Sequence, residues 1–339
     1  MSRILVTGGC GYIGSHTIVE LIEEGFEVVS LDNLENSSDS VLEGVHEITG
    51  TRVKNYVIDL RKKNELEVFF KSQPSFSGVI HFAALKSVND SVSEPLAYFE
   101  NNVVGLINLL EYVSFLKIPH FVFSSSCTVY GIPETLPVTE NMPYGDVESP
   151  YGRTKQICEM ILQDFVPAHP DTKVISLRYF NPAGAHESIL IGEDPANVAQ
   201  NLAPVITETA IGKREKMTVF GDDYDTRDGS CVRDYIHVTD LANAHILCLR
   251  HLESTPGAPS WETFNVGIGQ GVTVLEAINA FEEVTGQKLN YNIGPRRAGD
   301  IPAIFANYSK AKKTLGWTPK RGISVIMDTA WKWEQRRNA

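Results

Sequence analysis

Long apolar segments are absent from this sequence of 339 residues. A helix that crosses a membrane needs roughly 18 consecutive apolar residues, and no stretch of the chain approaches that length. The beginning of the chain also lacks the run of about 7 to 15 apolar residues of a secretory signal, because glycines interrupt it soon after Val6. We therefore expect a cytoplasmic protein with no membrane partner.

Positive charge is scarce as well. Lysine and arginine together number 30 against 42 aspartates and glutamates, which gives a formal net charge of −12. Nucleic acids and membrane surfaces are polyanionic, so this balance argues against both as partners. A few arginines gathered in one cleft can still bind a small anionic ligand.

The cysteines and histidines form no pattern typical of disulfides or metal ligands. There are five cysteines, an odd number, and neither Cys-x-x-Cys nor His-Glu-x-x-His occurs. The sequence therefore predicts reduced thiols and no metal site.

Short runs rich in β-branched residues alternate with longer helical stretches over the first 180 residues. Such alternation predicts a parallel sheet that helices cover on both faces. Beyond residue 180 the periodicity fades. We therefore expect a doubly wound α/β domain over 1–180, completed by a strand near 262–267, and a smaller mixed α/β domain over most of 181–339. The strands expected in the first domain are residues 3–7, 27–31, 53–60, 78–83, 120–125 and 173–180.

Two helical segments stand out. Residues 95–116 are apolar on nearly every side, so this helix must be covered on more than one face. A second helix near 150–167 starts with Ser149 as N-cap and Pro150 in the first turn. The pattern is compatible with burial in the core of one chain and with a homodimer interface formed by the two helices.

A glycine-rich loop joins the first expected strand to the first expected helix. Gly8 permits a tight turn, Gly11 lets the backbone approach a pyrophosphate, and Gly14 lets the helix pack closely on the strand. Asp32 follows the second strand, where a carboxylate accepts hydrogen bonds from ribose hydroxyls and repels a 2′-phosphate. This context predicts a Rossmann-type dinucleotide site that prefers NAD to NADP, although Asp32 also suits a turn cap.

Tyr151 and Lys155 lie four residues apart, on one face of the second helix. An ammonium there can lower the pKa of the phenol, which makes the phenol a usable general base. Ser126 follows the fifth strand, whose carboxyl end faces the ligand crevice of a doubly wound sheet. We therefore expect a Ser/Tyr/Lys catalytic constellation rather than a pair on a helix surface.

The chain resembles the extended short-chain dehydrogenase/reductase family, and in particular its branch of UDP-sugar 4-epimerases. The resemblance covers nearly the whole chain. The motifs that carry it are Thr-Gly-Gly-Cys-Gly-Tyr-Ile-Gly, Leu-Asp-Asn-Leu, His-Phe-Ala-Ala-Leu-Lys, Ser-Ser-Ser-Cys-Thr-Val-Tyr-Gly, Ser-Pro-Tyr-Gly-Arg-Thr-Lys, Leu-Arg-Tyr-Phe-Asn-Pro-Ala-Gly-Ala-His, Val-Arg-Asp-Tyr-Ile-His-Val and Arg-Arg-Ala-Gly-Asp.

This resemblance implies three sets of site residues. Catalysis is expected from Ser126, Tyr151 and Lys155. Contacts with NAD are expected from Gly8, Gly11, Tyr12, Ile13, Gly14, Asp32, Asn33, Asn36, Ser37, Asp59, Leu60, Phe82, Ala83, Ala84, Lys86, Asn101, Tyr151, Lys155 and Tyr179. Contacts with a UDP-hexose are expected from Lys86, Ser126, Tyr151, Phe180, Asn181, Asn201, Leu202, Phe220, Arg233, Tyr235, Arg297, Asp300 and Ile304.

The resemblance also implies a reaction, the reversible 4-epimerisation of UDP-galactose and UDP-glucose. Tyr151 would take the proton of the 4′-hydroxyl, tightly bound NAD would hold the hydride, and a transient 4-keto sugar would accept it back on its other face. Related dehydratases place Asp-Glu where Cys127 and Thr128 stand here, and decarboxylases carry Glu at the position of Thr128. The alternatives are another NAD-dependent nucleotide-sugar epimerase or dehydratase, or a non-catalytic NAD-binding regulator. A homodimer is also implied.

Among the positions that depart from the family pattern, two bear on the substrate site. Cys231 replaces a usual glycine beside Arg233, so a changed backbone angle would shift that arginine. Ile304 occupies the position that gates the sugar pocket, with a volume between a tyrosine, which restricts the site to hexoses, and a small residue, which admits N-acetylhexosamines. We expect a preference for hexoses and leave N-acetylated sugars open.

Overall fold

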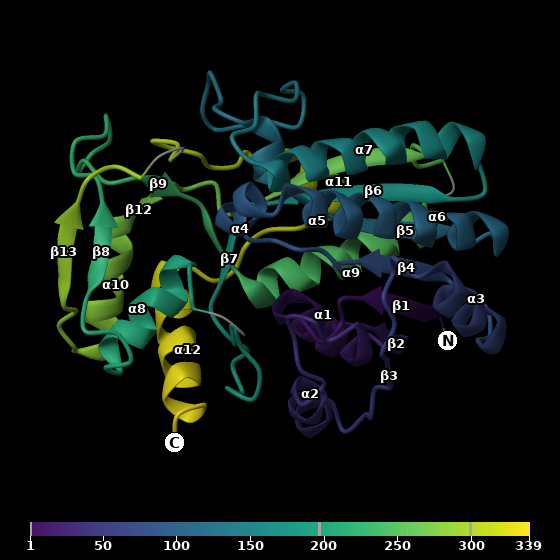
Figure 1. Cartoon of the computed structure of the whole chain (residues 1–339), viewed down its shortest axis with the longest axis horizontal. Helices are drawn as coiled ribbons and strands as arrows, with labels where there is room; N and C mark the ends of the chain where they lie inside the picture. The colour runs from purple at the N-terminus through teal and green to yellow at the C-terminus, as the bar shows by residue number, and fades with distance from the viewer. Residues whose placement is uncertain (1, 196–197, 256, 298–299) are drawn as a thin grey trace. The chain divides into compact units, whose positions relative to one another are not determined.

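The computed structural model describes residues 2–195, 198–255, 257–297 and 300–339. The chain forms two compact units (Figure 1). The first unit comprises Met1–Ile132, Glu140–Tyr179 and Ala242–Phe264, and the second unit comprises Pro133–Thr139, Phe180–Leu241 and Asn265–Ala339. Within the described residues, every helix is too short or too polar to span a lipid bilayer.

A seven-stranded sheet in the order β11-β6-β5-β4-β1-β2-β3 organises the first unit. The pairings from β6 to β3 are all parallel, so the predicted doubly wound fold is confirmed. The strands are β1 (Arg3–Thr7), β2 (Glu27–Leu31), β3 (Asn55–Tyr56), β4 (Gly78–His81), β5 (His120–Ser126), β6 (Lys173–Tyr179) and β11 (Trp261–Val266). The strand expected over 53–60 is only two residues long, as an edge strand with a single neighbour.

Helices cover the sheet. Leucine, valine and phenylalanine side chains of α3 (Lys63–Ser72), α6 (Gly105–Phe115) and α7 (Pro150–Ala168) bury one face, with the strand residues Leu5, Val79 and Phe121. Helix α1 (Tyr12–Glu23) and the part of α9 (Val238–Ser254) from Ala242 onward lie on the other face (Figure 1). Helices α2 (Val41–Thr49) and α4 (Val88–Ser93) also belong to this unit.

The apolar segment 95–116 is not one regular helix. It consists of α5 (Pro95–Tyr98), a π-helical stretch over Phe99–Val104, and α6. Asn102 in the π-helical stretch is buried and bonds the backbone of Leu85, with N···O distances of 2.8 and 3.0 Å. A π-bulge is frequent at functional sites, and this one brings a polar side chain to the loop after β4.

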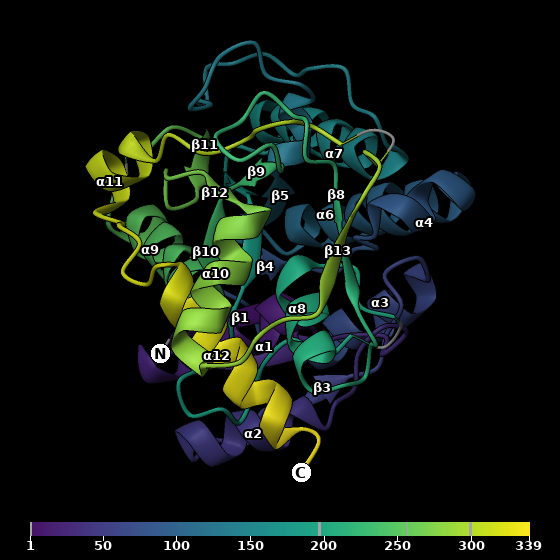
Figure 2. The same ribbon diagram turned by 90° about the vertical axis from the view of Figure 1, so that its left-hand side faces the viewer.

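The second unit is a smaller mixed α/β assembly. Its strands pair two by two: β7 (Asn181–Ala183) with β10 (Tyr235–His237), β8 (Met217–Phe220) with β13 (Tyr291–Gly294), and β9 (Val232–Arg233) with β12 (Val272–Thr273). Helices α8 (Leu202–Ala210), α10 (Val274–Thr285) and α12 (Ile323–Arg336) enclose an apolar core that includes Ile206, Phe281 and Ile326 (Figure 2). Helix α11 (Ser309–Leu315) is the shortest helix described in this unit.

Candidate active site

The order of the strands places two loops of the first unit side by side. β1 and β4 are neighbours in the sheet, although the chain runs outward to β2 and β3 between them. Ligands of doubly wound sheets bind beyond the carboxyl ends of the strands at such a reversal. The glycine loop after β1 and the segment Phe82, Ala83, Ala84 and Lys86 after β4 both begin at this edge.

Two glycines of the loop are required by the packing of the chain itself. Gly8 has a φ of 72°, and a Cβ atom added to it would lie 2.7 Å from the backbone nitrogen of Ala83. A Cβ atom on Gly14 would lie 2.2 Å from the carbonyl oxygen of Gly8. Both distances are too short for a side chain, which explains these two glycines without any ligand.

Gly11 differs from its neighbours. Its φ is −76°, and an added Cβ atom would approach only the Gly8 oxygen, at 3.2 Å. Gly11 is the N-cap of α1, and among the described residues no side chain caps this helix and no acid lies in its first turn, which begins with Tyr12 and Ile13. The open approach and the uncapped helix end suit a pyrophosphate.

Asp32 is bound within the chain after β2. One carboxylate oxygen accepts the Cys10 N–H at 3.0 Å, and the other accepts the Leu34 N–H and the Ser37 hydroxyl, both at 2.9 Å. The turn-cap interpretation of Asp32 is therefore correct in this structure. A carboxylate has about four acceptor positions, so one remains for a ribose hydroxyl. Asn33 and Asn36 lie in the same turn.

Asp59, with Leu60 beside it, has a partner that the sequence did not reveal. Arg61 Nη2 contacts the Asp59 carboxylate at 2.7 Å and Glu35 at 3.2 Å. Although partial burial alone would raise it, hydrogen bonds and charge from Arg61 hold the pKa of the Asp59 carboxyl below its ordinary value. Because two carboxylates already bind Arg61, this cation is not free to attract a 2′-phosphate, which supports the preference for NAD.

The structure brings the three catalytic candidates together. Ser126 ends β5 and hydrogen-bonds Tyr151, which lies in the first turn of α7. Lys155 is buried, donates to the carbonyl oxygen of Ser124 at 2.6 Å and lies 5.9 Å from the Tyr151 ring centroid. As predicted, Ser149 caps α7, accepting the N–H of Gly152 at 3.2 Å.

Burial controls the protonation of this group in the protein chain alone. It raises the pKa of Tyr151 to about 12, against the hydrogen bond from Ser126, and lowers the pKa of Lys155 to about 8. The expected lowering of the phenol pKa by the ammonium is therefore not seen. Desolvation disfavours both charged forms, and it is the largest influence on each of the two pKa values.

Other NAD candidates lie around residues that sequence reasoning missed. Tyr179 ends β6, and its hydroxyl lies 2.5 Å from Nε2 of His245, a buried residue of α9. The His245 ring centroid is 4.7 Å from that of Phe82. Asn101 donates to Asn102 at 3.0 Å. No motif pointed to His245 or Asn102, because their partners are distant in the sequence.

Two arginines of the second unit share one carboxylate. Asp300 Oδ1 accepts Arg233 at 3.2 Å and Arg297 at 2.9 Å. Arg233 also donates to the carbonyl oxygens of Val232 and Ile301, at 2.9 and 2.7 Å. Two guanidinium groups and one carboxylate leave a net positive charge, which suits an anionic ligand. Ala298 and Gly299, in the same motif, lie outside the described residues.

The remaining substrate candidates surround this cluster or pair with one another. Phe220 lies 5.6 Å from the Arg297 guanidinium, and the backbone N–H of Ile304 bonds the Val232 oxygen. Phe180 is buried, and Asn181 pairs with Tyr235 across β7 and β10. The backbone φ of Cys231 is not positive, so this residue does not need the left-handed conformation that favours glycine. The expected change of backbone angle beside Arg233 is therefore not seen.

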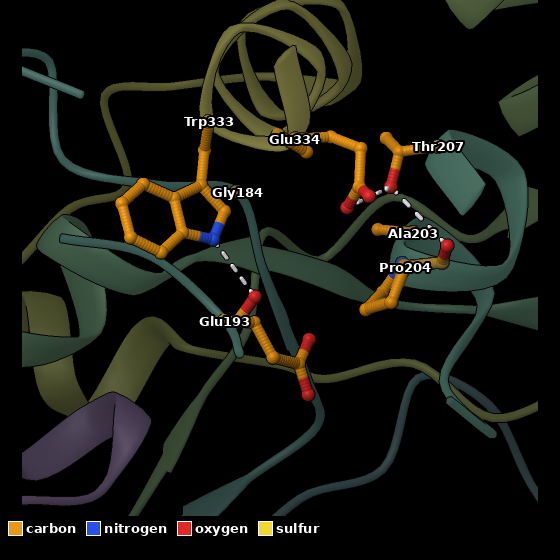
Figure 3. A pocket seen from close by; sticks show the side chains of 8 residues that line it. Gly184, Glu193, Ala203, Pro204, Thr207, Trp333 and Glu334 are labelled. Carbon is orange, nitrogen blue, oxygen red and sulfur yellow. Dashed lines mark hydrogen bonds between the residues drawn. The ribbon is translucent and has the colours of Figure 1, made fainter. Parts of the chain in front are cut away.

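Asn201 is bonded to Glu193, which lines a small cavity of the second unit. Its side chain precedes Leu202 of α8 and donates to the Glu193 carboxylate at 2.7 Å. The backbone oxygen of Glu193 accepts the Trp333 indole N–H at 2.9 Å (Figure 3). Helices α8 and α12 supply most of the lining of this cavity.

The glycine loop, the acid after β2 and the Ser/Tyr/Lys group define the class of extended short-chain dehydrogenases/reductases. A family model described as GDP-mannose 4,6 dehydratase matches residues 5–329. The UDP-glucose 4-epimerase of Bacillus subtilis (strain 168) is 47% identical over 331 residues, 98% of this chain and 96% of that protein. The chain therefore belongs to the extended family that this model represents and, within it, to the UDP-glucose 4-epimerases.

Solved structures agree with this assignment. A UDP-glucose 4-epimerase from Bifidobacterium longum in complex with NAD+ and UDP has a TM-score of 0.94 at 43% identity, covering 99% of both chains. One from Stenotrophomonas maltophila, with bound NAD and formylated UDP-arabinopyranose, has a TM-score of 0.95 at 43% identity, covering 100% of this chain and 99% of that one. The open side of Gly11 and the uncapped end of α1 fit the NAD of such structures.

Substitution by alanine should affect the crowded Gly14 and the open Gly11 differently. Gly14→Ala should cost more than about 2 kcal/mol of unfolding free energy, because its Cβ atom would overlap the Gly8 oxygen. Gly11→Ala should cost less than about 1 kcal/mol but weaken NAD binding by about tenfold. Urea unfolding and calorimetric titration with NAD measure the two effects. Equal destabilisation by both variants, or unchanged NAD affinity in Gly11→Ala, would contradict this account.

Proposed function

We propose that this chain interconverts UDP-galactose and UDP-glucose by inverting C4 of the sugar, with NAD as a bound cofactor. The observation that carries the proposal is the buried Ser126–Tyr151–Lys155 group at the end of β5. The family supports it, since the relatives named above are UDP-glucose 4-epimerases.

The three side chains have separate tasks in this reaction. Tyr151, as phenolate, removes the proton of the 4′-hydroxyl and later returns it to the ketone oxygen, while Ser126 orients both oxygens. Lys155, as ammonium, stabilises the phenolate. NAD supplies the hydride acceptor when bound. Because both the proton and the hydride return to the sugar, the reaction has no net change in NAD or in the protonation of Tyr151.

The match to a dehydratase family model raises the alternative of elimination. Removal of the C5 proton and loss of the 6-hydroxyl require an acid and a base close to the 4-keto sugar. The related dehydratases use Asp-Glu for this purpose, whereas Cys127 and Thr128 carry no carboxylate. With Cys127 and Thr128 at these positions, the 4-keto sugar can take back the hydride but has no groups to eliminate water. We therefore propose epimerisation rather than dehydration.

We propose that Arg233 and Arg297 bind the UDP diphosphate and that Asp300 accepts the uridine ribose hydroxyls. The net positive charge of this cluster supports the first role, since a diphosphate brings about two negative charges. The buried Ile304 supports a preference for hexoses over bulkier N-acetylated sugars.

We also propose a homodimer and a cytoplasmic location. Apolar side chains of the segment 95–116 and of α7 remain exposed: Leu96 at 81%, Val104 at 41%, Ile107 at 39%, Phe115 at 81% and Met160 at 43%. An exposed apolar surface on this scale marks a protein interface. The five cysteines are free and buried, which suits a reducing compartment.

Turnover by the purified protein tests the proposed reaction. We expect UDP-glucose to form from UDP-galactose without added NAD, and Tyr151→Phe to lower kcat by at least about 100-fold while NAD remains bound. UDP-N-acetylgalactosamine in the same assay should turn over more slowly. Binding of NAD without any product would point to a regulator, and a dehydrated keto sugar would point to the elimination reaction.

The pKa of Tyr151 predicts how NAD+ binding depends on pH. Without cofactor, burial raises this pKa to about 12, so the phenol is neutral at physiological pH. A nicotinamide cation favours the phenolate, so binding releases a proton and NAD+ affinity should rise from about pH 7 to about pH 9. Calorimetric titration should show a shallower rise in Tyr151→Phe. Since Lys155 also titrates near this range, identical slopes in both proteins would contradict a phenolate contribution.

The exposed apolar side chains predict that charge would separate the dimer. We expect wild type to sediment as a dimer and the double variant Ile107→Glu, Met160→Glu to sediment as a folded monomer, because both introduced carboxylates would be desolvated. Val68→Glu is the control, since Val68 of α3 is 71% exposed outside this surface. A monomeric wild type, or a double variant that remains dimeric, would refute the interface.

A further inference from the structure

A buried ion pair lies one helical turn from the catalytic candidates and has no role in the chemistry above. Glu159 of α7 is fully buried, and the Arg178 side chain of β6 is 5% exposed. Arg178 donates hydrogen bonds to both carboxylate oxygens of Glu159, from Nη2 at 2.6 Å and from Nε at 3.0 Å. The fork geometry fixes the orientation of α7 relative to β6.

Further polar groups complete this cluster, which we call the α7 anchor: Ser125, Tyr130, Tyr144, Glu159 and Arg178. Ser125 and Tyr144 donate their hydroxyls to the two oxygens of Glu159, the latter at 2.9 Å. Arg178 donates to the Tyr130 hydroxyl at 3.0 Å. The Glu159 carboxylate thus receives four donors, as many as it can accept. The α7 anchor therefore has no acceptor left on Glu159 for a ligand.

Stability alone is a poor explanation for the α7 anchor. Burying two charges costs several kcal/mol of desolvation for each ion, and well-packed apolar residues often replace such pairs without loss. An ion pair does, however, specify one geometry, which a set of apolar contacts does not. The location of the α7 anchor indicates what that geometry serves.

Three residues of the α7 anchor lie close to catalytic or cofactor candidates. β5 and β6 pair Ser125 with Arg178 and, one residue further, Ser126 with Tyr179. Neighbouring side chains of a strand point to opposite faces, so Ser125 and Arg178 share the face on which α7 packs. Glu159 follows Lys155 by four residues, on the same side of α7. Figure 1 shows α7 running along β5 and β6.

We infer that Ser125, Glu159 and Arg178 are positioning residues, which fix α7 against the ends of β5 and β6 and so hold Tyr151 and Lys155 beside Ser126. As a role in catalysis, this inference rests on the proposed epimerase reaction. A small shift or rotation of α7 would carry Lys155 away from the Ser124 carbonyl and Tyr151 away from Ser126.

Glu159 also influences the charge of Lys155. The groups that face this ammonium are Tyr151, Cys158 and Glu159 from α7, the Phe123 ring and the Ser124 carbonyl from β5, and His81 from β4. Arg178 of β6 bonds Glu159. His81 is neutral, because burial lowers its pKa to about 3. Burial lowers the pKa of Lys155 while Cys158 and Glu159 raise it. Loss of the Glu159 charge should therefore lower it further.

The variant Glu159→Gln tests the inference in the holoenzyme. We expect kcat for UDP-galactose to fall by about tenfold to a hundredfold with KM changed less than about twofold, because the machinery is displaced while the UDP site is intact. The alkaline limb of the kcat profile should move to lower pH by about one unit, since Lys155 loses its proton sooner. Ser125→Ala, which keeps the carboxylate, should lower kcat by a smaller factor without moving that limb.

Glu334→Gln is the matched control. Glu334 of α12 in the second unit is also a buried carboxylate, with Lys213 at 3.1 Å, Arg337 at 2.7 Å and the Thr207 hydroxyl at 3.4 Å. It should lower the unfolding midpoint as Glu159→Gln does but leave kcat and the pH profile unchanged. If Glu159→Gln behaves like this control, the α7 anchor is only structural and the inference fails.

A crystal structure of Glu159→Gln separates this test from that of the proposed function. We expect Lys155 Nζ to move out of hydrogen-bond distance from the Ser124 oxygen, now 2.6 Å away. An unmoved Lys155 refutes the positioning role even if wild type proves inactive. If Glu159→Gln does not fold, the structure and kinetics of Ser125→Ala decide, and wild-type values for both would refute the inference.

Discussion

The parallel pairing of β5 with β4 and β6 is the constraint on which the rest of the first unit depends. Parallel strands end at one edge of a sheet, so residues that are far apart in the sequence become neighbours there. Ser126 and Tyr179 lie at equivalent positions of β5 and β6. The loop after β4 meets the glycine loop after β1 by the same geometry, as the short distance from Gly8 to Ala83 shows.

Burial at this edge determines what the reactive groups can do. Tyr151 and Lys155 are both desolvated, so the protein chain alone favours the neutral phenol and weakens the hold of Lys155 on its proton. A site in this state has little phenolate until another positive charge arrives. In the reaction proposed above, general-base strength is thus coupled to cofactor binding, so the chain without NAD would have no activated base to react unproductively.

Sequence reasoning predicted the placement of residues where local spacing sets it. The glycine loop, the acid after β2 and the four-residue separation of Tyr151 and Lys155 are each set within one turn or strand, and the structure places them as predicted. It failed where a partner comes from a distant segment. His245 and Asn102 carry no motif, and periodicity did not reveal the π-helical stretch at Asn102. Arg61 is close to Asp59 in the sequence, but its second partner, Glu35, is not. Sequence reasoning also did not reveal that burial raises the pKa of Tyr151 in the protein chain alone, because residue spacing indicates which charges are near but not how much water is excluded.

The balance between electrostatic attraction and desolvation cost explains why the charged groups of the two sets of site residues differ in burial. In the second unit the Arg297 side chain is 47% exposed, and Asp300 offsets only part of the positive charge, so an anion gains attraction without the cost of stripping a buried ion. Near Tyr151 the charges are buried, and each needs a full set of partners, which Glu159 has in its four donors. A UDP-sugar enzyme that inverts C4 needs both arrangements. The nucleotide must bind firmly through cations that remain partly exposed, whereas proton removal must occur where water is excluded and geometry is fixed. The α7 anchor supplies that fixed geometry without entering the reaction, since none of its polar groups is needed to exchange a proton with the sugar.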